Sequence, residues 1–213
     1  MTRPVAEPDH LVVAAATLQQ GVDWFAALTG VTPRAGGKHV AMGTHNALVR
    51  IGPRLYLEII AIDPDGNRPL RARWFDLDSA DLQAQLAERP RLIHWVARTT
   101  DLDALLARAT IAPGIVHPMA RGEYRWRITI ADDGKLPADG VAPTLIQWDG
   151  THPVDGMPAA PITMTQFAAS HPDSTGVRSA LAALGLQDAL SVTYGRDPRL
   201  AVMLRTPRGL VAL

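Results

Sequence analysis

Apolar strands and amphipathic helices follow one another along this chain in an order that repeats. A short apolar strand is predicted at residues 10–16, and Thr17 is expected to cap a helix that runs to about residue 29 and stops at Gly30. Apolar runs separated by turn residues then predict three strands, near residues 38–42, 47–51 and 55–62. A second amphipathic helix is predicted at residues 78–88. One strand, one helix and three strands therefore make up the first unit.

The same order of elements returns twice more. The second round is predicted from a strand at residues 92–98, a helix capped by Asp101, and strands near residues 115–118, 124–131 and 144–148. A third, partial round has a strand at 162–168, a helix at 174–184 and strands at 190–194, 201–205 and 210–213. We therefore predict an α+β fold of repeated β-α-β-β-β modules, in one domain spanning residues 8–213. Its modules cover about 8–62, 91–149 and 162–213, with a connector at 63–90 and a proline-rich linker at 150–161.

The rounds can be aligned residue by residue. A shift of 84 lays Asp101 on Thr17 and His94 on His10, whereas the third round has Thr165 at this position. Allowing five extra loop residues, Gln147 in the last strand of the second round matches Glu58 in the first. Polar side chains thus recur at matching strand positions in two repeats.

Glu58 is the one charged residue in an otherwise apolar strand, residues 55–62. Strand alternation places Tyr56, Glu58 and Ile60 on one face of the predicted sheet. Because a buried, unpaired carboxylate costs several kcal/mol, we expect Glu58 to meet a cation, bind a metal or take up a proton. A structural ion pair or a solvated face is the alternative interpretation.

Composition narrows the function further. The 213 residues carry 21 basic and 21 acidic side chains, so no overall field attracts nucleic acid or an anionic membrane. No cysteine is present, which excludes thiolate chemistry and leaves histidine and oxygen ligands for any metal. Neither a signal peptide nor a membrane-spanning run is evident, and we expect a cytoplasmic protein.

Three segments carry a family resemblance: Asp9-His10-Leu11-Val12 opens the first module, Tyr56-Leu57-Glu58-Ile59-Ile60 closes it, and Leu92-Ile93-His94-Trp95 opens the second. In this arrangement the chain resembles the vicinal oxygen chelate superfamily, and its glyoxalase-like branch in particular. The resemblance implies the curved mixed sheets of the glyoxalase, bleomycin-resistance and dioxygenase proteins. It also implies a divalent metal, zinc, nickel, manganese or iron, at His10, Glu58, His94 and Gln147.

The implied chemistry is that of a metal-dependent lyase or isomerase acting on a small molecule with adjacent oxygens, with Glu58 as the catalytic group. An amide cannot serve as a base, so Gln147 argues against efficient turnover of the methylglyoxal–glutathione hemithioacetal. Two alternatives stay open. One is an iron-dependent ring-cleaving dioxygenase, and the other is a non-catalytic protein that binds or sequesters a small molecule.

Further polar and aromatic residues are candidates for contact with the substrate. His45 and Asn46 lie in a predicted turn before a strand, Arg125 could hold an anionic group, and Trp126 could form a pocket wall. Each has a purely structural alternative, because turn, surface and core roles are common for these residue types. The sequence leaves the oligomeric state open, with a homodimer as one option.

Overall fold

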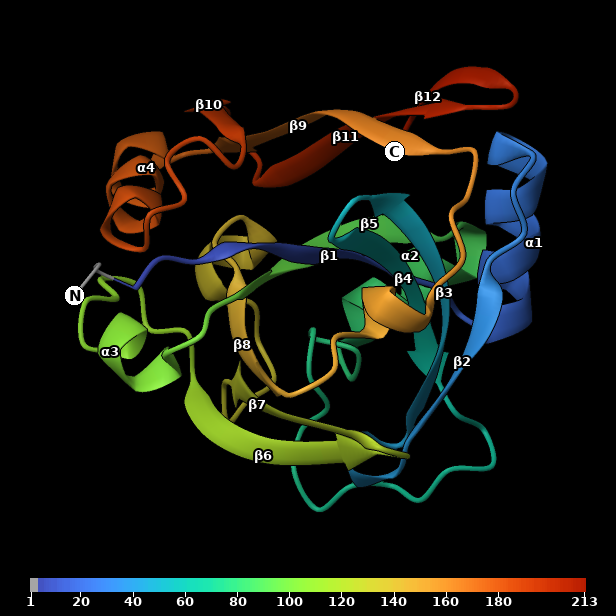
Figure 1. The fold of residues 1–213 in the computed structure, drawn as a ribbon, viewed down its shortest axis with the longest axis horizontal. Coiled ribbons are helices and arrows are strands. Elements are labelled where there is room, and N and C mark those ends of the chain that lie inside the picture. The colour runs from blue at the N-terminus through green and yellow to red at the C-terminus, as the bar shows by residue number, and fades with distance from the viewer. Residues whose placement is uncertain (1–3) are drawn as a thin grey trace.

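The computed structural model describes residues 4–213, which form two β-sheets (Figure 1). The first repeat contains β1 (Glu7–Ala14), α1 (Leu18–Thr29), β2 (Arg34–His39), η1 (Val40–Met42), β3 (Thr44–Gly52) and β4 (Leu55–Ile62), followed by α2 (Ala80–Glu88). The second contains β5 (Arg91–Arg98), α3 (Leu102–Leu106), β6 (Ile115–Arg121), β7 (Tyr124–Ile130), η2 (Pro137–Gly140) and β8 (Thr144–Asp149). The remainder contains η3 (Pro153–Gly156), β9 (Thr163–His171), α4 (Ser174–Ala183), β10 (Ser191–Tyr194), β11 (Arg199–Thr206) and β12 (Gly209–Ala212).

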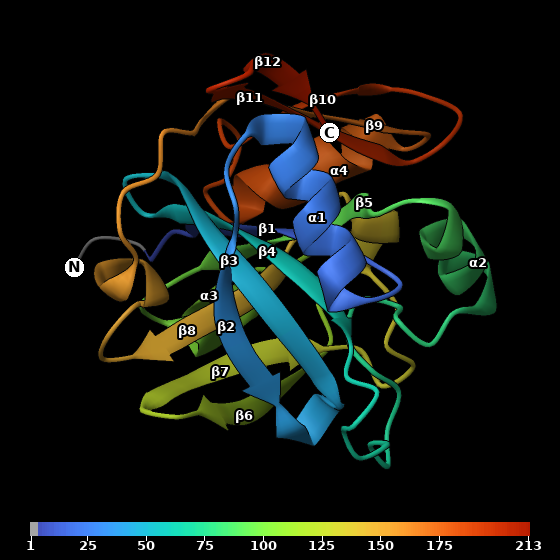
Figure 2. The same ribbon diagram turned by 90° about the vertical axis from the view of Figure 1, so that its right-hand side faces the viewer.

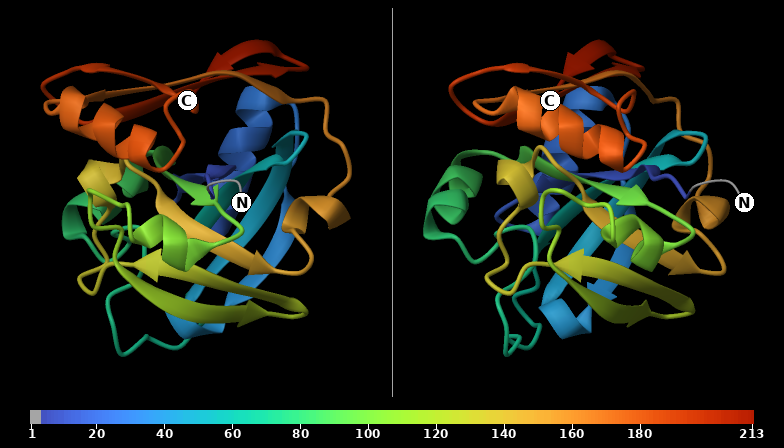
Figure 3. Two further views of the ribbon diagram at one scale, coloured as in Figure 1. Left: turned by 60° about the vertical axis from the view of Figure 1, so that its left-hand side comes forward. Right: turned by 90° about the vertical axis from the view of Figure 1, so that its left-hand side faces the viewer.

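The large sheet is built from two equivalent halves. Its strand order is β2-β3-β4-β1-β5-β8-β7-β6, so each module contributes four neighbouring strands. β1 runs parallel to β4, and β5 runs parallel to β8. The halves join where β1 pairs antiparallel with β5, with Leu11 opposite Trp95. The sheet curls into a half-barrel (Figure 3), which confirms the predicted α+β fold of repeated modules in curved mixed sheets.

Local sequence explains where the main elements begin and end. The Thr17 side chain accepts a hydrogen bond from the backbone of Gln20 at the start of α1, and Gly30 adopts the left-handed conformation after its end. Asp101 caps α3 in the same way. The strand expected near residues 38–42 ends earlier than predicted, because residues 40–42 form the short helix η1.

The convex face of the large sheet carries the main core. Leu57 and Ile59 of β4 point to this face and pack with Phe25 of α1 and with residues of the C-terminal sheet, among them Phe167. Figure 2 shows α1 and the C-terminal sheet on this side. The C-terminal unit repeats the order of elements, but its strands pair as β10-β9-β11-β12, so β9 lies between β10 and β11. None of the helices within residues 4–213 has the length and apolar character needed to cross a membrane.

The concave face is filled by the segment between the two modules. Trp74, Phe75 and Leu77 of this segment are buried there against β-strand residues such as Val12 and Val96. Phe75 and Asp76 have φ angles of 60° and 55°, a left-handed conformation that side chains other than glycine rarely adopt. This turn directs the two aromatic rings into the half-barrel, and it limits the open space beside the polar residues of β1 and β4.

Packing of α1 on β4 gives a first prediction. A Cβ atom added at Gly21 would lie 2.5 Å from Ile59 Cγ2 and 2.9 Å from Ala15 Cβ, so the helix would have to move away from the sheet. Gly21→Ala should therefore lower the free energy of unfolding by about 1–3 kcal/mol, although alanine favours helix. Urea unfolding measures this change. The exposed control Asp23→Ala should stay within about 0.5 kcal/mol of wild type, and an unchanged Gly21→Ala would contradict the packing.

Candidate functional site

A small polar cavity lies on the concave face, near the junction of the two modules. Its volume is about 20 Å³, enough for roughly one water molecule. It is lined by two histidines, one carboxylate, one guanidinium and several aromatic side chains: His10, His39, Asn46, Tyr56, Glu58, Trp74, Phe75, Arg121, Trp126, Ile128, Ile146 and Trp148. The cavity therefore combines acid–base groups with apolar walls.

Asp9 and His10 contact one another because β1 is irregular at this point. Pro8 lies opposite Ala97 and His10 lies opposite Val96, so Asp9 is an extra residue in the ladder with β5. Such a β-bulge re-aims side chains that would otherwise alternate between the two faces. His10 Nδ1 lies 2.6 Å from Asp9 Oδ1, and both side chains are buried. The bulge thus produces an aspartate–histidine pair from two adjacent residues.

Asp9 is fully buried and receives three hydrogen bonds. Besides His10, Trp148 Nε1 donates to Oδ2 at 3.0 Å, and His152 Nε2 lies 2.8 Å from the same atom. Burial alone would raise the pKa of Asp9, but the hydrogen bonds from His10 and His152 outweigh it and hold that pKa well below its usual range. Asp9 is therefore an anion, and it fixes the proton of His10 on Nδ1.

Glu58 faces the open nitrogen of this histidine. Its Oε1 accepts a hydrogen bond of 2.5 Å from Asn46 Nδ2, and its Oε2 lies 3.7 Å from His10 Nε2. The His10 ring also stacks on Tyr56, with the ring centroids 4.6 Å apart. Burial and the nearby carboxylates of Asp9 and Glu58 raise the pKa of Tyr56 well above its ordinary value, so this phenol stays protonated. Glu58, His10 and Tyr56 thus present three acid–base groups to one cavity.

Arg121 closes the cavity from the opposite edge of the sheet. This residue ends β6, yet its Nη1 lies 3.1 Å from both His39 Nε2 and Asn46 Oδ1. Gly37 leaves room for this side chain, because a Cβ at Gly37 would lie 2.9 Å from Arg121 Cδ. Burial, followed by the charge of Arg121, lowers the pKa of His39 to about 3, so its ring is neutral. Arg121 supplies a cation that touches both modules.

His94 lies on the same face as His10 but makes a separate set of contacts. Its Nδ1 lies 3.1 Å from the Gly140 carbonyl, and its Nε2 accepts a hydrogen bond from the Thr144 backbone at 3.1 Å. Burial lowers the pKa of His94 to about 3, against the weaker opposite effect of the Gly140 bond. His94 is therefore neutral, with both ring nitrogens occupied by the protein.

Strand pairing shows that the second-module counterpart of Glu58 is Thr144 rather than Gln147. Val12 pairs with Glu58 in the first half, and Val96, which the shift of 84 lays on Val12, pairs with Thr144 in the second. Gln147 is three residues farther along and faces the opposite side of the sheet. Its Oε1 accepts hydrogen bonds from the Leu102 backbone and from Arg127.

Of the substrate-contact candidates, the structure brings two to the cavity and leaves two outside. Asn46 and Trp126 line the cavity. His45 faces the other way and lies 4.0 Å from Asp63. Arg125 is exposed, and its guanidinium donates to the backbone carbonyls of Gly122 and Tyr124.

Comparisons with known proteins agree with this architecture. A family model described as a glyoxalase-like domain matches residues 9–185. The chain belongs to the glyoxalase-like family of the vicinal oxygen chelate superfamily. A search of curated proteins gave no match.

Solved structures resemble this glyoxalase-like chain at low sequence identity. A hypothetical protein from Staphylococcus aureus is 13% identical with a TM-score of 0.58, covering 98% of this chain and 84% of that protein. A variant of methylmalonyl-CoA epimerase from Streptomyces coelicolor, in complex with 2-nitronate-propionyl-CoA, is 17% identical with a TM-score of 0.43, covering 70% and 98%. The epimerase from Mycobacterium tuberculosis is 19% identical with a TM-score of 0.42, covering 73% and 95%.

The metal ligands expected for a glyoxalase-like protein are not assembled as a set of four. His10 Nε2 and Glu58 Oε2 are close enough to share one ion, because ligand atoms about 2.1 Å from a metal can lie up to about 4.2 Å apart. His94 has no ring nitrogen to offer without breaking its bonds, and Gln147 lies across the sheet. Within the described chain, no group of three or more His, Cys, Asp or Glu side chains is arranged to hold a metal.

Several site residues of this glyoxalase-like chain were not predicted from its sequence. Asp9 stands next to His10, but regular alternation would have placed the two on opposite faces. His152 comes from the linker, where it caps η3 and reaches Asp9. His39 and Arg121 belong to opposite edges of the sheet, so only the curvature of the half-barrel brings them together.

Two buried, neutral histidines, His39 in the cavity wall and His94 outside it, predict a pH dependence of stability. Below about pH 6.5 the unfolded chain takes up protons on His39 and His94, whereas the folded protein does so only near pH 3. Stability should therefore fall as the pH falls through this window, by on the order of 2 kcal/mol per histidine between about pH 6.5 and 4.5. Urea unfolding at several pH values measures the slope.

The variant His94→Gln should show a shallower slope than wild type, whatever its absolute stability, because one of the two buried titrating groups is gone. His45→Gln is the matched control, since His45 lies outside the cavity and is only partly buried. Equal slopes in wild type and His94→Gln would show that His94 is not held neutral.

Proposed function

We propose that this glyoxalase-like protein is a lyase- or isomerase-type enzyme in which Glu58 moves a proton on a small carbonyl compound with a second oxygen on the adjacent carbon. One observation carries the proposal: Oε1 of Glu58 is held by Asn46, while Oε2 faces His10 Nε2 across 3.7 Å inside an aromatic cavity. A general base must be fixed and within reach of the proton that it abstracts. Glu58 meets the first condition through Asn46.

In the proposed step, Glu58 Oε2 takes the proton from the carbon next to the carbonyl. The C–H electron pair moves into the new carbon–carbon double bond, and the carbonyl electrons move to the oxygen, giving an enolate. His10, whose Nδ1 proton is held by Asp9, is placed to hydrogen-bond the enolate oxygen through Nε2 when protonated. Return of the proton to the same carbon can invert its configuration. Return to the former carbonyl carbon, with the proton of the adjacent hydroxyl passing to the enolate oxygen, completes an isomerisation. In a lyase reaction the enolate instead expels a leaving group from the next carbon, and the leaving group takes the proton from Glu58.

Space in the cavity limits how the substrate can enter. A volume of about 20 Å³ admits only the reacting end of a molecule, and further room requires movement of the aromatic walls, Phe75 and Trp126 among them. This steric limit favours small substrates. It also agrees with a site from which bulk water is excluded, where charge interactions are strengthened.

Exchange of carbon-bound hydrogen in deuterium oxide tests the chemistry directly, because it requires only proton abstraction. On a panel of α-hydroxy ketones and α-keto acids, wild type should catalyse exchange seen by proton NMR, and Glu58→Gln should lower the rate by a factor of about 10²–10⁴. Gln147→Glu is the control. Its side chain faces the opposite side of the sheet, so the added carboxylate should not raise the rate.

Exchange by wild type that persists in Glu58→Gln would assign the base elsewhere. Absence of exchange with every compound, together with retained ligand binding, would favour the second candidate, a non-catalytic small-molecule-binding protein. Oxygen consumption with an aromatic diol in iron-loaded protein would instead favour a ring-cleaving dioxygenase.

We further propose that any divalent ion binds through His10 and Glu58, without His94. Added zinc, nickel, manganese or iron(II) should then raise the Tm of wild type, because a ligand of the folded state stabilises it. The rise should be lost in Glu58→Gln and retained in His94→Gln, with each variant compared to its own metal-free sample. Loss of the rise in His94→Gln would support the three-ligand site expected from the sequence, and no rise in wild type would remove the metal from the proposal.

A further inference from the structure

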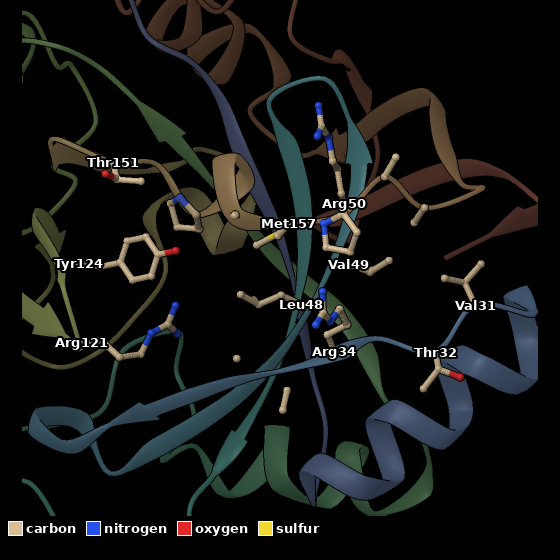
Figure 4. A pocket seen from close by; sticks show the side chains of 18 of the residues that line it. Val31, Thr32, Arg34, Leu48, Val49, Arg50, Arg121, Tyr124, Thr151 and Met157 are labelled. Atoms are coloured by element: carbon tan, nitrogen blue, oxygen red, sulfur yellow. The ribbon is translucent and has the colours of Figure 1, made fainter.

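A groove of about 670 Å³ lies outside the cavity, a volume typical of a site for a small organic ligand. Its walls come from the β2–β3 edge, the turn between β6 and β7, and the linker around η3. Figure 4 shows Arg121 and Tyr124 on one side of the open space, with Arg34 and Leu48 facing them from the other. Neither the sequence pattern nor the family assignment gives this groove a role.

The groove continues the concave face on which the cavity lies. Along β3, Asn46 lines the cavity and Leu48, two residues farther, lines the groove. Along β7, Trp126 lines the cavity and Tyr124, two residues before it, lines the groove. Arg121 lines both. A molecule lying in the groove would therefore have one end directed at the acid–base residues.

Charge in the groove is positive. Arg34 and Arg121 both line it, and among residues 4–213 neither forms a salt bridge with a carboxylate. Arg50 also lines the groove, but its guanidinium is bound to the Gly52 and Pro53 carbonyls. Glu123, which is exposed, is the single acidic side chain in the lining. Arg121 contacts His39 and Asn46 through Nη1, which leaves its Nε and Nη2, together with the Arg34 guanidinium, available to an anion.

Apolar side chains form much of the rest of the groove wall. Leu48 belongs to a small cluster with Tyr56 and Val154, and Met157 packs against this cluster. Met157 and Pro153 from the linker line the groove together with the Tyr124 ring. The combination of an apolar floor and convergent guanidinium groups suits a ligand with an apolar body and an anionic group.

We propose that this groove binds a small organic anion, with the anionic group held by Arg34 and Arg121 and the apolar body against Leu48 and Met157. The proposal rests on the proposed function, because it makes this molecule the substrate whose reactive end reaches Glu58. It narrows the substrate to an organic carboxylate or phosphate ester and excludes neutral carbonyl compounds as preferred substrates.

Binding of three probes tests the proposal without any turnover. Benzoate, phenyl phosphate and benzyl alcohol share an apolar ring and differ in the attached group, so calorimetry or NMR titration separates carboxylate, phosphate and neutral chemistry. At least one anion should bind about tenfold or more tightly than benzyl alcohol, and added salt should weaken that binding.

Arg34→Gln should weaken binding of the preferred anion by about tenfold or more, since a charge-assisted contact is lost. Arg196→Gln removes the same charge from an exposed guanidinium that does not line the groove, and it should change affinity less than about twofold. Equal losses of anion affinity in both variants would show that binding depends only on the net charge of the protein, and would overturn the proposed site. Equal binding of benzyl alcohol and the anions would overturn it as well.

Glu58→Gln separates this inference from the proposed function. That variant should still bind the anion while losing hydrogen exchange. If wild type binds the anion, Arg34→Gln does not, and wild type catalyses no hydrogen exchange, the groove is supported and the proposed enzymatic function is rejected. Exchange without anion binding to wild type would support the enzyme and reject the groove.

Discussion

The Asp9 carboxylate is completely buried, and an anion in such a place is tolerated only when donors surround it. Its donors come from three parts of the chain: His10 beside it on β1, Trp148 at the end of β8 and His152 in the linker. The same bonds hold β1, the second module and the linker in fixed relation around the cavity. Removal of one partner would leave a buried charge or donor unsatisfied, which is more costly than the loss of the bond itself.

Pseudo-symmetry explains why one half of the sheet carries the reactive pair and the other does not. His10 faces Glu58 in the first half, and His94 faces Thr144 at the corresponding position in the second. Threonine and the Gly140 carbonyl satisfy both nitrogens of His94, so that histidine has a complete set of structural contacts. His10 keeps one nitrogen directed at a carboxylate. The two repeats thus share backbone positions but differ in the chemistry available at them.

Hydrophobic periodicity predicted the repeat and the face on which Glu58 lies, and the threonine before the first helix predicted the cap of α1, because these features depend on local sequence. The partners of Glu58 depend on features that leave no such pattern. A bulge of one residue aims Asp9 at His10, and the curvature of the sheet brings Arg121 from its far edge. The match of Gln147 to Glu58 assumes five extra loop residues in the second module, which the strand pairing does not support. An error of three residues in a strand exchanges one face of the sheet for the other.

A ligand that enters the cavity from the groove would meet the buried aromatic segment that contains Trp74 and Phe75. Phe75 and Asp76 each hold a left-handed conformation that costs of order 1–3 kcal/mol outside glycine, so the surrounding packing must maintain it. Trp74, which precedes them, is buried beside the cavity with its Nε1 unpaired among the described residues. A strained turn and an unsatisfied donor both lower the free energy needed to displace this segment. The segment lines the cavity but not the groove, and Arg121 lines both. A ligand held in the groove would therefore direct its reactive end past Arg121 into the cavity, toward this aromatic segment.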